Sequence, residues 1–209
     1  MDRRIEEYIF DHLGPESSVL NELYRYTNLN VPYPGMISGH EQGRLLSMIS
    51  HMVSPGRILE IGAYTGYSAI CLAEGLIAGG RLHTIEQDDE RAEIASTFFE
   101  KAGVTDRITL HVGDALEMIP QFDIVFDLVF IDAAKKQYLD YYHAIFDKVK
   151  QGGYILVDNI LWYGKVADPQ IRDETTDKLR DFNDFVSKDE RIKKAIIQNR
   201  DGLFILRKK

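Results

Sequence analysis

The chain has 209 residues, of which 44% are hydrophobic, with one cysteine and a formal net charge of −8. This length and apolar content suit a single domain over residues 1–209, and we expect helices over 1–55 and a sheet with its covering helices over 56–209. The acidic balance argues against a general nucleic-acid-binding protein, because affinity for phosphates comes mainly from Lys and Arg. A lone Cys71, a charged N-terminus and the absence of a long apolar run predict a soluble, cytoplasmic protein with no membrane partner.

The N-terminal part of the chain has the periodicity of helices. Apolar residues recur at spacings of three and four in IEEYIFDHL (5–13), in a segment that opens at Ser17 or Ser18, and in EQGRLLSMISHMV (41–53). The stretch NLNVPYPGMISG (28–39) is rich in Pro, Gly and Asn, which predicts a loop.

From Arg57 onward, short apolar runs alternate with amphipathic stretches. The runs are RILEI (57–61), RLHTI (81–85), RITLHV (107–112), DLVFI (127–131) and YILV (154–157), and their rhythm predicts parallel strands joined by helices. A charged helical segment follows from about Asp168 to Ser187. Asp201-Gly202 then separates KKAIIQ from LFILR, which is typical of an antiparallel hairpin. The predicted fold is therefore α/β: a doubly wound, mostly parallel seven-stranded sheet with a C-terminal antiparallel hairpin and N-terminal helices.

The loop LEIGAYTGYS, after the first predicted strand, has the glycine spacing of a nucleoside site. Gly62 and Gly66 follow the strand and Ser68 opens the next helix, at the edge of an open sheet where ligands bind. A P-loop needs Lys and then Ser or Thr after its second glycine, which this loop lacks, and Tyr64 interrupts a dinucleotide fingerprint. The pattern E-x-G-x-x-x-G fits a third option, S-adenosylmethionine.

The next two strand ends support this cofactor. Glu86 ends the second strand, where its carboxylate can accept hydrogen bonds from both ribose hydroxyls. GDAL follows the third strand and places Asp114 and Ala115 where an adenine can lie, with Asp114 able to accept from the amino group. Taken singly, such residues are usually turn or solvated residues, but their occurrence at three successive strand ends favours a cofactor site.

Two further strand ends carry oxygen-bearing side chains. The strand DLVFI is followed by Asp132 and, three residues later, Lys135, and the strand YILV is followed by Asp158 and Asn159. Two carboxylates and an amide oxygen on one rim of the sheet form a hard donor set that suits Mg²⁺. The alternative for Asp158-Asn159 alone is a cap or an Asx turn, but the combination with Asp132 and Lys135 favours a metal site.

These motifs together resemble the cation-dependent class I O-methyltransferases, a family that includes plant caffeoyl-coenzyme A O-methyltransferases, animal catechol O-methyltransferase and small bacterial members. The segments that carry the resemblance span nearly the entire chain: MISGHEQGRLL, LEIGAYTGYS, FIDAAKKQYLDYY, DNILWYGKV and DGLFILRKK. The resemblance implies a Rossmann-like methyltransferase sheet, S-adenosylmethionine as cofactor, a divalent cation and a homodimer.

The family's functional residues map onto positions of this chain. The resemblance implies metal ligands at Asp132, Asp158 and Asn159, and catalytic roles for Lys135 and Asp132. It implies cofactor contacts at Met36, Glu60, Gly62, Ser68, Glu86, Asp114, Ala115 and Asp132. One departure is Ala134, because the plant enzymes typically have Asp-Ala-Asp-Lys where this chain has Asp-Ala-Ala-Lys, so contacts of that second Asp do not carry over.

The expected reaction is O-methylation of a catechol-like small aromatic whose two adjacent oxygens bind the metal, with Mg²⁺ favoured over Mn²⁺ or Ca²⁺. Lys135 would take the proton of the acceptor hydroxyl or steer the oxyanion. Trp162 and Tyr163 either line an aromatic pocket or pack a loop. Two alternatives stay open: a tRNA uridine bearing a hydroxyl next to a ring carbonyl as the acceptor, and a non-catalytic nucleoside-binding module.

Overall fold

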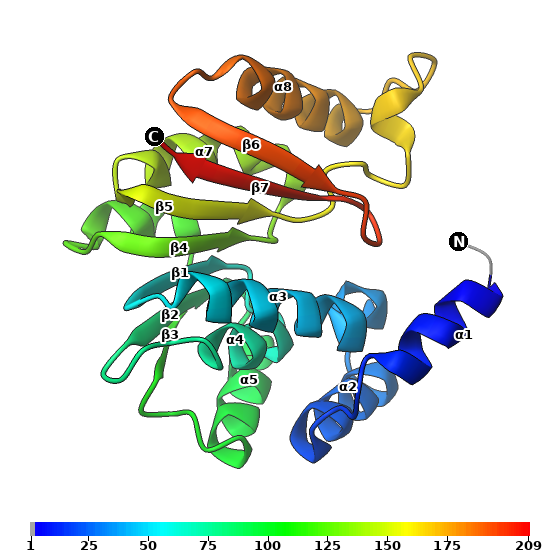
Figure 1. The fold of residues 1–209 in the computed structure, drawn as a ribbon, viewed down its shortest axis with the longest axis vertical. Coiled ribbons are helices and arrows are strands. Elements are labelled where there is room, and N and C mark those ends of the chain that lie inside the picture. Colours follow the sequence, from blue (N-terminus) through cyan, green and yellow to red (C-terminus); the bar gives the residue numbers. More distant parts are fainter. Residues whose placement is uncertain (1–2) are drawn as a thin grey trace.

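The computed structural model describes residues 3–209, which form one sheet with helices packed on both faces (Figure 1). The strands are β1 (Arg57–Ile61), β2 (Arg81–Glu86), β3 (Ile108–Val112), β4 (Phe126–Ile131), β5 (Val149–Val157), β6 (Ile192–Ile197) and β7 (Leu203–Lys208). They lie in the order β3-β2-β1-β4-β5-β7-β6. Strands β1 to β5 pair in parallel, whereas β7 runs antiparallel to both β5 and β6. The predicted α/β fold with a C-terminal antiparallel hairpin is confirmed.

Helices fill the connections between the strands. They are α1 (Arg3–His12), α2 (Ser18–Asn30), α3 (Gly39–Val53), α4 (Tyr67–Ala73), α5 (Asp89–Lys101), α6 (Ala115–Met118), α7 (Tyr138–Phe146) and α8 (Glu174–Lys188). Short 3-10 turns are η1 (Pro34–Met36), η2 (Ile119–Gln121), η3 (Lys135–Gln137) and η4 (Lys165–Ala167). Helices α2 to α5 pack against one face of the sheet and α6 to α8 against the other. Within residues 3–209, no helix has the length and apolar character needed to cross a membrane.

Strand β4 shows why the sheet lies at the centre of the molecule. Leu128 and Phe130 belong to the core on the face covered by α2 to α5, whereas Val129 and Ile131 belong to the core on the opposite face. All four side chains are fully buried. Because side chains alternate along a strand, a continuous apolar run is what a parallel strand covered on both faces requires.

The register of the parallel strands brings their carboxyl ends to one edge of the sheet. Ile61 at the end of β1 lies opposite Ile131 at the end of β4, which in turn lies opposite Val157 at the end of β5. The residues that follow these strand ends therefore meet at the same edge: Gly62, Asp132 and Asp158.

Most helix boundaries lie within two residues of the sequence prediction, and the larger differences are at two places. The helix predicted over 168–187 is wrong at its start, because α8 begins only at Glu174. The Asp173 side chain accepts a hydrogen bond from the main-chain N–H of Thr176 at 2.9 Å and caps the helix there. The loop predicted over 28–39 also begins later than expected, since α2 continues to Asn30, and it contains the turn η1.

Candidate active site

A cleft in two parts opens at the carboxyl edge of the parallel strands. Its larger part is a cavity of 1310 Å³ and its smaller part a cavity of 450 Å³. The two parts share a wall and so form one continuous site, whose common lining residues are Met36, Gly62, Tyr64, Asp132, Ala133 and Ala134. This position is where open α/β sheets bind their ligands.

The glycine loop after β1 passes so close to β4 that a side chain does not fit. Gly62 has a φ of +98°, and a Cβ on it would lie 2.2 Å from the main-chain oxygen of Asp132. Gly66, the N-cap residue directly before α4, has a φ of +94°, and a Cβ on it would lie 2.7 Å from the ring of Phe99. Both positions therefore require glycine, and Gly62 leaves bare backbone at the wall shared by the two cavities.

We predict that Gly62→Ala lowers the free energy of unfolding by about 3 kcal/mol or more, because it adds a backbone clash to the cost of a left-handed φ. Chemical denaturation measures this loss. Gly79→Ala is the matched control, since Gly79 also has a positive φ, of +73°, but a Cβ added there would meet nothing within 4 Å. That control is expected to lose only about 1 kcal/mol. Equal losses at the two positions would show that the contact with Asp132 is unimportant.

Glu86, at the end of β2, forms one wall of the smaller cavity. Its Oε2 accepts the main-chain N–H of Tyr64 at 2.7 Å and its Oε1 that of Asp88 at 3.1 Å. Burial raises the pKa of this carboxyl above its usual range. The two main-chain hydrogen bonds fix the carboxylate, and each oxygen keeps a second lone pair that can accept a ribose hydroxyl.

Asp114 and Ala115 also line the smaller cavity, together with Tyr141. Asp114 caps α6, where its Oδ1 accepts the main-chain N–H of Leu116 at 2.7 Å. The second carboxylate oxygen remains available to a ligand that enters the cavity. Of the cofactor contacts predicted from the sequence, those that line one or both cavities are Met36, Gly62, Ser68, Glu86, Asp114, Ala115 and Asp132.

Glu60 lies outside both cavities, beneath the glycine loop. Its side chain is fully buried, and Thr84 on β2 donates a hydrogen bond to Oε2, whereas Oε1 has no hydrogen-bond partner. Burial raises the pKa of Glu60 to about 7. The structure therefore places this residue under the loop that lines both cavities, rather than in either cavity.

The raised pKa of Glu60 makes stability depend on pH. Between about 4.5 and 7 the folded protein keeps a proton on Glu60 that the unfolded chain releases, so stability falls as pH rises through this window. We predict that Glu60→Gln reduces this fall in unfolding free energy by about 2 kcal/mol, measured by denaturation across the window in the presence of chelator. An unchanged pH slope in the variant would contradict the assignment.

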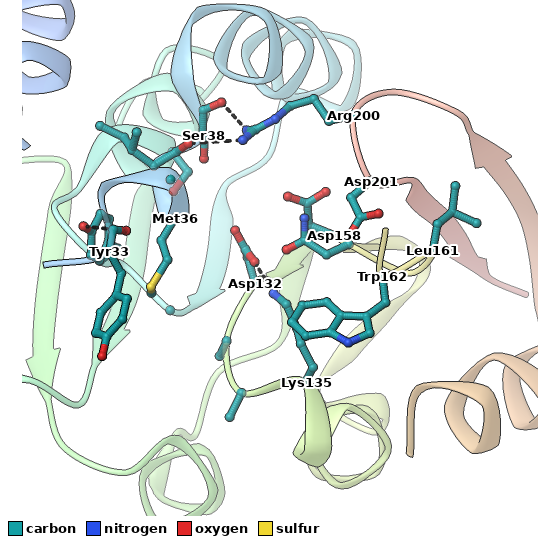
Figure 2. Close-up of a pocket in the computed structure, with 18 of the residues that line it drawn as sticks. Tyr33, Met36, Ser38, Asp132, Lys135, Asp158, Leu161, Trp162, Arg200 and Asp201 are labelled. Atoms are coloured by element: carbon teal, nitrogen blue, oxygen red, sulfur yellow. Dashed lines mark hydrogen bonds and ion pairs between the residues drawn. The ribbon is translucent and has the colours of Figure 1, made fainter. Parts of the chain in front are cut away.

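Asp158 and Asn159 follow β5 directly and line the larger cavity. Figure 2 shows Asp158 facing Asp132 across the floor of this cavity. Asp158 is only 3% exposed, and its Oδ1 has no hydrogen-bond partner. Burial and then the neighbouring charge of Asp132 raise the pKa of Asp158 well above its usual range. The hydroxyl of Tyr138 donates to the main-chain oxygen of Asp158 at 2.9 Å, which holds the end of the strand in place. Asn159 has a φ of +56°, a left-handed conformation that Asn tolerates better than most residues.

Lys135 reaches the same floor from η3. Its Nζ lies 2.6 Å from Oδ1 of Asp132, and the two side chains are 13% and 18% exposed. The ammonium also lies 5.2 Å from the ring centre of the buried Tyr138. Figure 2 shows the lysine pointing to Asp132 beside the indole of Trp162. The lysine is therefore held beside the acidic pair, which is formed by Asp132 and Asp158.

The donor atoms at this floor fit a divalent cation. An acidic oxygen that is buried without a partner, as Oδ1 of Asp158 is, requires a positive charge or a proton. Among the described residues, no three His, Cys, Asp or Glu side chains come together as a metal site, so the third protein ligand here would be the amide oxygen of Asn159. Carboxylate and amide oxygens, with sites left for water or substrate, are what Mg²⁺ prefers.

The walls of the larger cavity include residues that the sequence did not single out as site residues. Tyr64 lines both cavities, and Arg200 and Asp201 reach the larger one from the turn between β6 and β7. Asp201 accepts the main-chain N–H of Tyr163 at 2.6 Å. In the sequence, Asp201 is only a hairpin signal, and nothing indicates that this turn folds over the site. Trp162 and Tyr163 do line the cavity, and the indole N–H of Trp162 is buried without a partner.

Comparison with known proteins assigns the family. The O-methyltransferase family matches residues 11–209. A caffeoyl-CoA O-methyltransferase of Populus kitakamiensis is 34% identical over 219 residues, covering 98% of this chain and 93% of the relative. A catechol O-methyltransferase of Niastella koreensis is 30% identical, covering 93% and 89%. The crystal structure of an O-methyltransferase from Bacillus cereus in complex with SAH has a TM-score of 0.91 at 30% identity, covering 99% of this chain and 97% of that one.

The chain therefore belongs to the O-methyltransferase family. With its fold and cofactor cleft, it is an S-adenosylmethionine-dependent O-methyltransferase of the caffeoyl-CoA and catechol type. The resemblance seen in the sequence is confirmed, as is S-adenosylmethionine as the cofactor that it implied. The alternative of a non-catalytic nucleoside-binding module is set aside.

Proposed function

We propose that this enzyme methylates one hydroxyl of a catechol-like small molecule and that it needs a divalent cation, preferably Mg²⁺, to do so. The observation that carries the proposal is the buried, unpartnered Oδ1 of Asp158 in the larger cavity, opposite Asp132. Asp132 also lines the smaller cavity, which we take as the cofactor cavity. Asp132, Asp158 and Asn159 would hold the cation. Mn²⁺ and Ca²⁺ share its preference for oxygen ligands and are the alternatives.

The chain's own residues position the acceptor and move its proton. A cation bound at the acidic pair supplies charge that favours the ionised form of the acceptor hydroxyl. Lys135, held beside Asp132, takes the hydroxyl proton or holds the resulting oxyanion. The methyl group then passes from the sulfonium sulfur to the oxygen: the C–S bond breaks as the O–C bond forms, which leaves a neutral thioether. Holding the two reactants near attack distance can supply about 7–11 kcal/mol of barrier lowering.

The lining of the larger cavity supports a flat, ring-shaped acceptor. Trp162 and Tyr33 contribute aromatic walls, and Met36 lines both the larger cavity and the cofactor cavity. Aromatic and apolar walls with a few polar groups are typical of sites for small organic ligands. The relatives named for caffeoyl-CoA and for catechol support an acceptor with two adjacent hydroxyls.

The test is methyl transfer from labelled S-adenosylmethionine to simple catechols and to bulk tRNA, each with Mg²⁺ and with chelator. We expect label in the catechols only when metal is present. Label in RNA instead of catechols would replace the acceptor class with a modified uridine. Full activity after exhaustive chelation would contradict the metal requirement.

We also propose that the enzyme acts in the cytoplasm as a homodimer that uses its N-terminal helices. The exposed apolar side chains of Ile5, Tyr8 and Phe10 on α1 support such an interface. Light scattering of the full chain should give twice the mass of one chain, and Phe10→Glu should shift it toward a monomer. A wild-type protein that is monomeric at all concentrations would contradict the dimer.

A further inference from the structure

Arg200 reaches across the mouth of the larger cavity from the turn between β6 and β7. Its two terminal nitrogens donate to main-chain oxygens on the far side, Nη1 to Ser38 and Nη2 to Ile37, the latter at 3.4 Å. Figure 2 shows the side chain extended above Asp158 and Asp201 toward Ser38. A guanidinium has five N–H donors, so this one is fixed in place while most of its donors remain free.

Arg200 differs in pairing from the other cations that line this cavity. Lys135 is paired with Asp132 at 2.6 Å, and Lys136 is paired with Glu174. No ion pair involves Arg200 anywhere in the described part of the chain, residues 3–209. A divalent cation at the acidic pair would add to this positive charge. Asp158 and Asp201 lie close enough to feel the charge of Arg200, but neither forms an ion pair with it. With a cation neutralising the acidic pair, the guanidinium could therefore bind a negative group on a ligand.

The backbone at Arg200 is held in a conformation that a glycine would adopt more easily. Its φ is +47°, and for a long side chain this left-handed region is strained. Strain kept at a residue that lines a site is a reason to look for a function of its side chain.

The hairpin turn does not depend on Arg200 for its attachment. Asn199 donates to the buried Gln42 at 2.9 Å, which ties the turn to α3. On the other side, the main-chain N–H groups of Ile160 and Leu161 donate to the oxygens of Gly202 and Asp201 at 3.2 and 2.9 Å. These bonds hold the turn on both sides, so the guanidinium is available for another task.

We propose that Arg200 is the residue that selects the acceptor, by binding an anionic group on its side chain: the preferred acceptor is then a dihydroxy aromatic acid. This inference rests on the proposed function, because the two hydroxyls lie at the acidic pair while the carboxylate lies at Arg200. Arg pairs with a carboxylate through two parallel N–H···O bonds, which suits a group that must also be oriented. Its role is recognition, and it takes no part in the transfer step.

The test compares two acceptors that differ only in charge: protocatechuate and its neutral amide. In the wild type, we expect a KM for the acid at least about tenfold below that for the amide. Arg200→Gln should abolish this preference by raising the KM for the acid alone, with kcat for both acceptors unchanged. Arg200→Lys keeps the charge and should retain part of the preference. A purely structural role would shift both acceptors equally, and that result would overturn the proposal.

Failure of the proposed function and failure of this inference are distinguishable. Turnover of the neutral amide with Mg²⁺ reports on the proposed function by itself, whatever the charge preference. Calorimetric titration of both compounds into the Mg²⁺-loaded protein measures the same preference without turnover. If the wild type and Arg200→Gln bound the acid with equal affinity, the inference would be overturned. It would also be overturned if Arg200→Gln slowed methylation of tRNA and left that of the acid unchanged.

Discussion

Replacing Asp158 with Asn is expected to weaken Mg²⁺ binding by more than about 100-fold and to reduce methyl transfer to the background rate. The change keeps the size of the side chain but removes the charge that a cation at this floor would neutralise. Asp158 is 3% exposed, and its Oδ1 accepts no hydrogen bond from the described part of the protein. A bound cation would therefore be the partner of this oxygen. Calorimetric titration of Mg²⁺ and turnover of a catechol measure the two effects separately.

The matched control is Asp140→Asn, the same chemical change at an exposed residue in the first turn of α7. It should bind Mg²⁺ and turn over like the wild type. The variant Asp158→Asn should also be more stable than the wild type at about pH 8 in chelator, because it removes a buried carboxyl whose pKa is raised by burial and by Asp132. Wild-type Mg²⁺ affinity in Asp158→Asn would show that the cation, if it binds, binds elsewhere.

Replacing Lys135 with Met is expected to lower kcat about 100- to 10,000-fold at saturating Mg²⁺, with little change in KM. The long apolar stem of the side chain is kept, and what is lost is the ammonium 2.6 Å from Asp132. Because Met leaves the acidic pair with one positive neighbour fewer, Mg²⁺ binding should be at least as tight as in the wild type.

Lys135→Arg separates the two roles that Lys135 can have. Arginine keeps the positive charge but cannot act as a base in a protein. A rate as low as that of Lys135→Met assigns proton transfer to the lysine, whereas a rate near the wild type assigns charge stabilisation. Lys150→Met, at an exposed ion pair with Asp127, is the control for a lost lysine. An unchanged kcat in Lys135→Met would make the lysine a bystander.

Strand ends explain why so much of the site could be predicted from the sequence. Apolar runs that stop at Gly62, Glu86, Asp114, Asp132 and Asp158 indicate both the sheet and its ligand-binding edge. A parallel sheet brings such positions together whatever the details of the helices. Local sequence is therefore sufficient to predict the functional residues that directly follow a strand.

The residues that could not be predicted depend on contacts between distant segments. Arg200 reaches the cavity because the β6–β7 turn packs on the start of α3, where Asn199 meets Gln42 across 157 positions of sequence. Tyr138 supports Asp158 through a single hydrogen bond from a different element. Glu60 fits the cofactor motif, yet its position on β1 turns it into the interior beside Thr84. None of these placements produces a periodic pattern in the sequence from which it could be predicted.

We propose above that Asp132, Asp158 and Asn159 hold a divalent cation, and we expect this cation to bind both oxygens of the acceptor. The most direct test is a titration of Mn²⁺ into the chelator-stripped wild-type protein with SAH bound. Electron paramagnetic resonance measures the free ion at each step. We predict one saturable site whose affinity rises with catechol present and not with phenol, because linkage makes metal and two-oxygen acceptor strengthen each other's binding. The absence of saturable binding, or an equal effect of catechol and phenol, would contradict the claim.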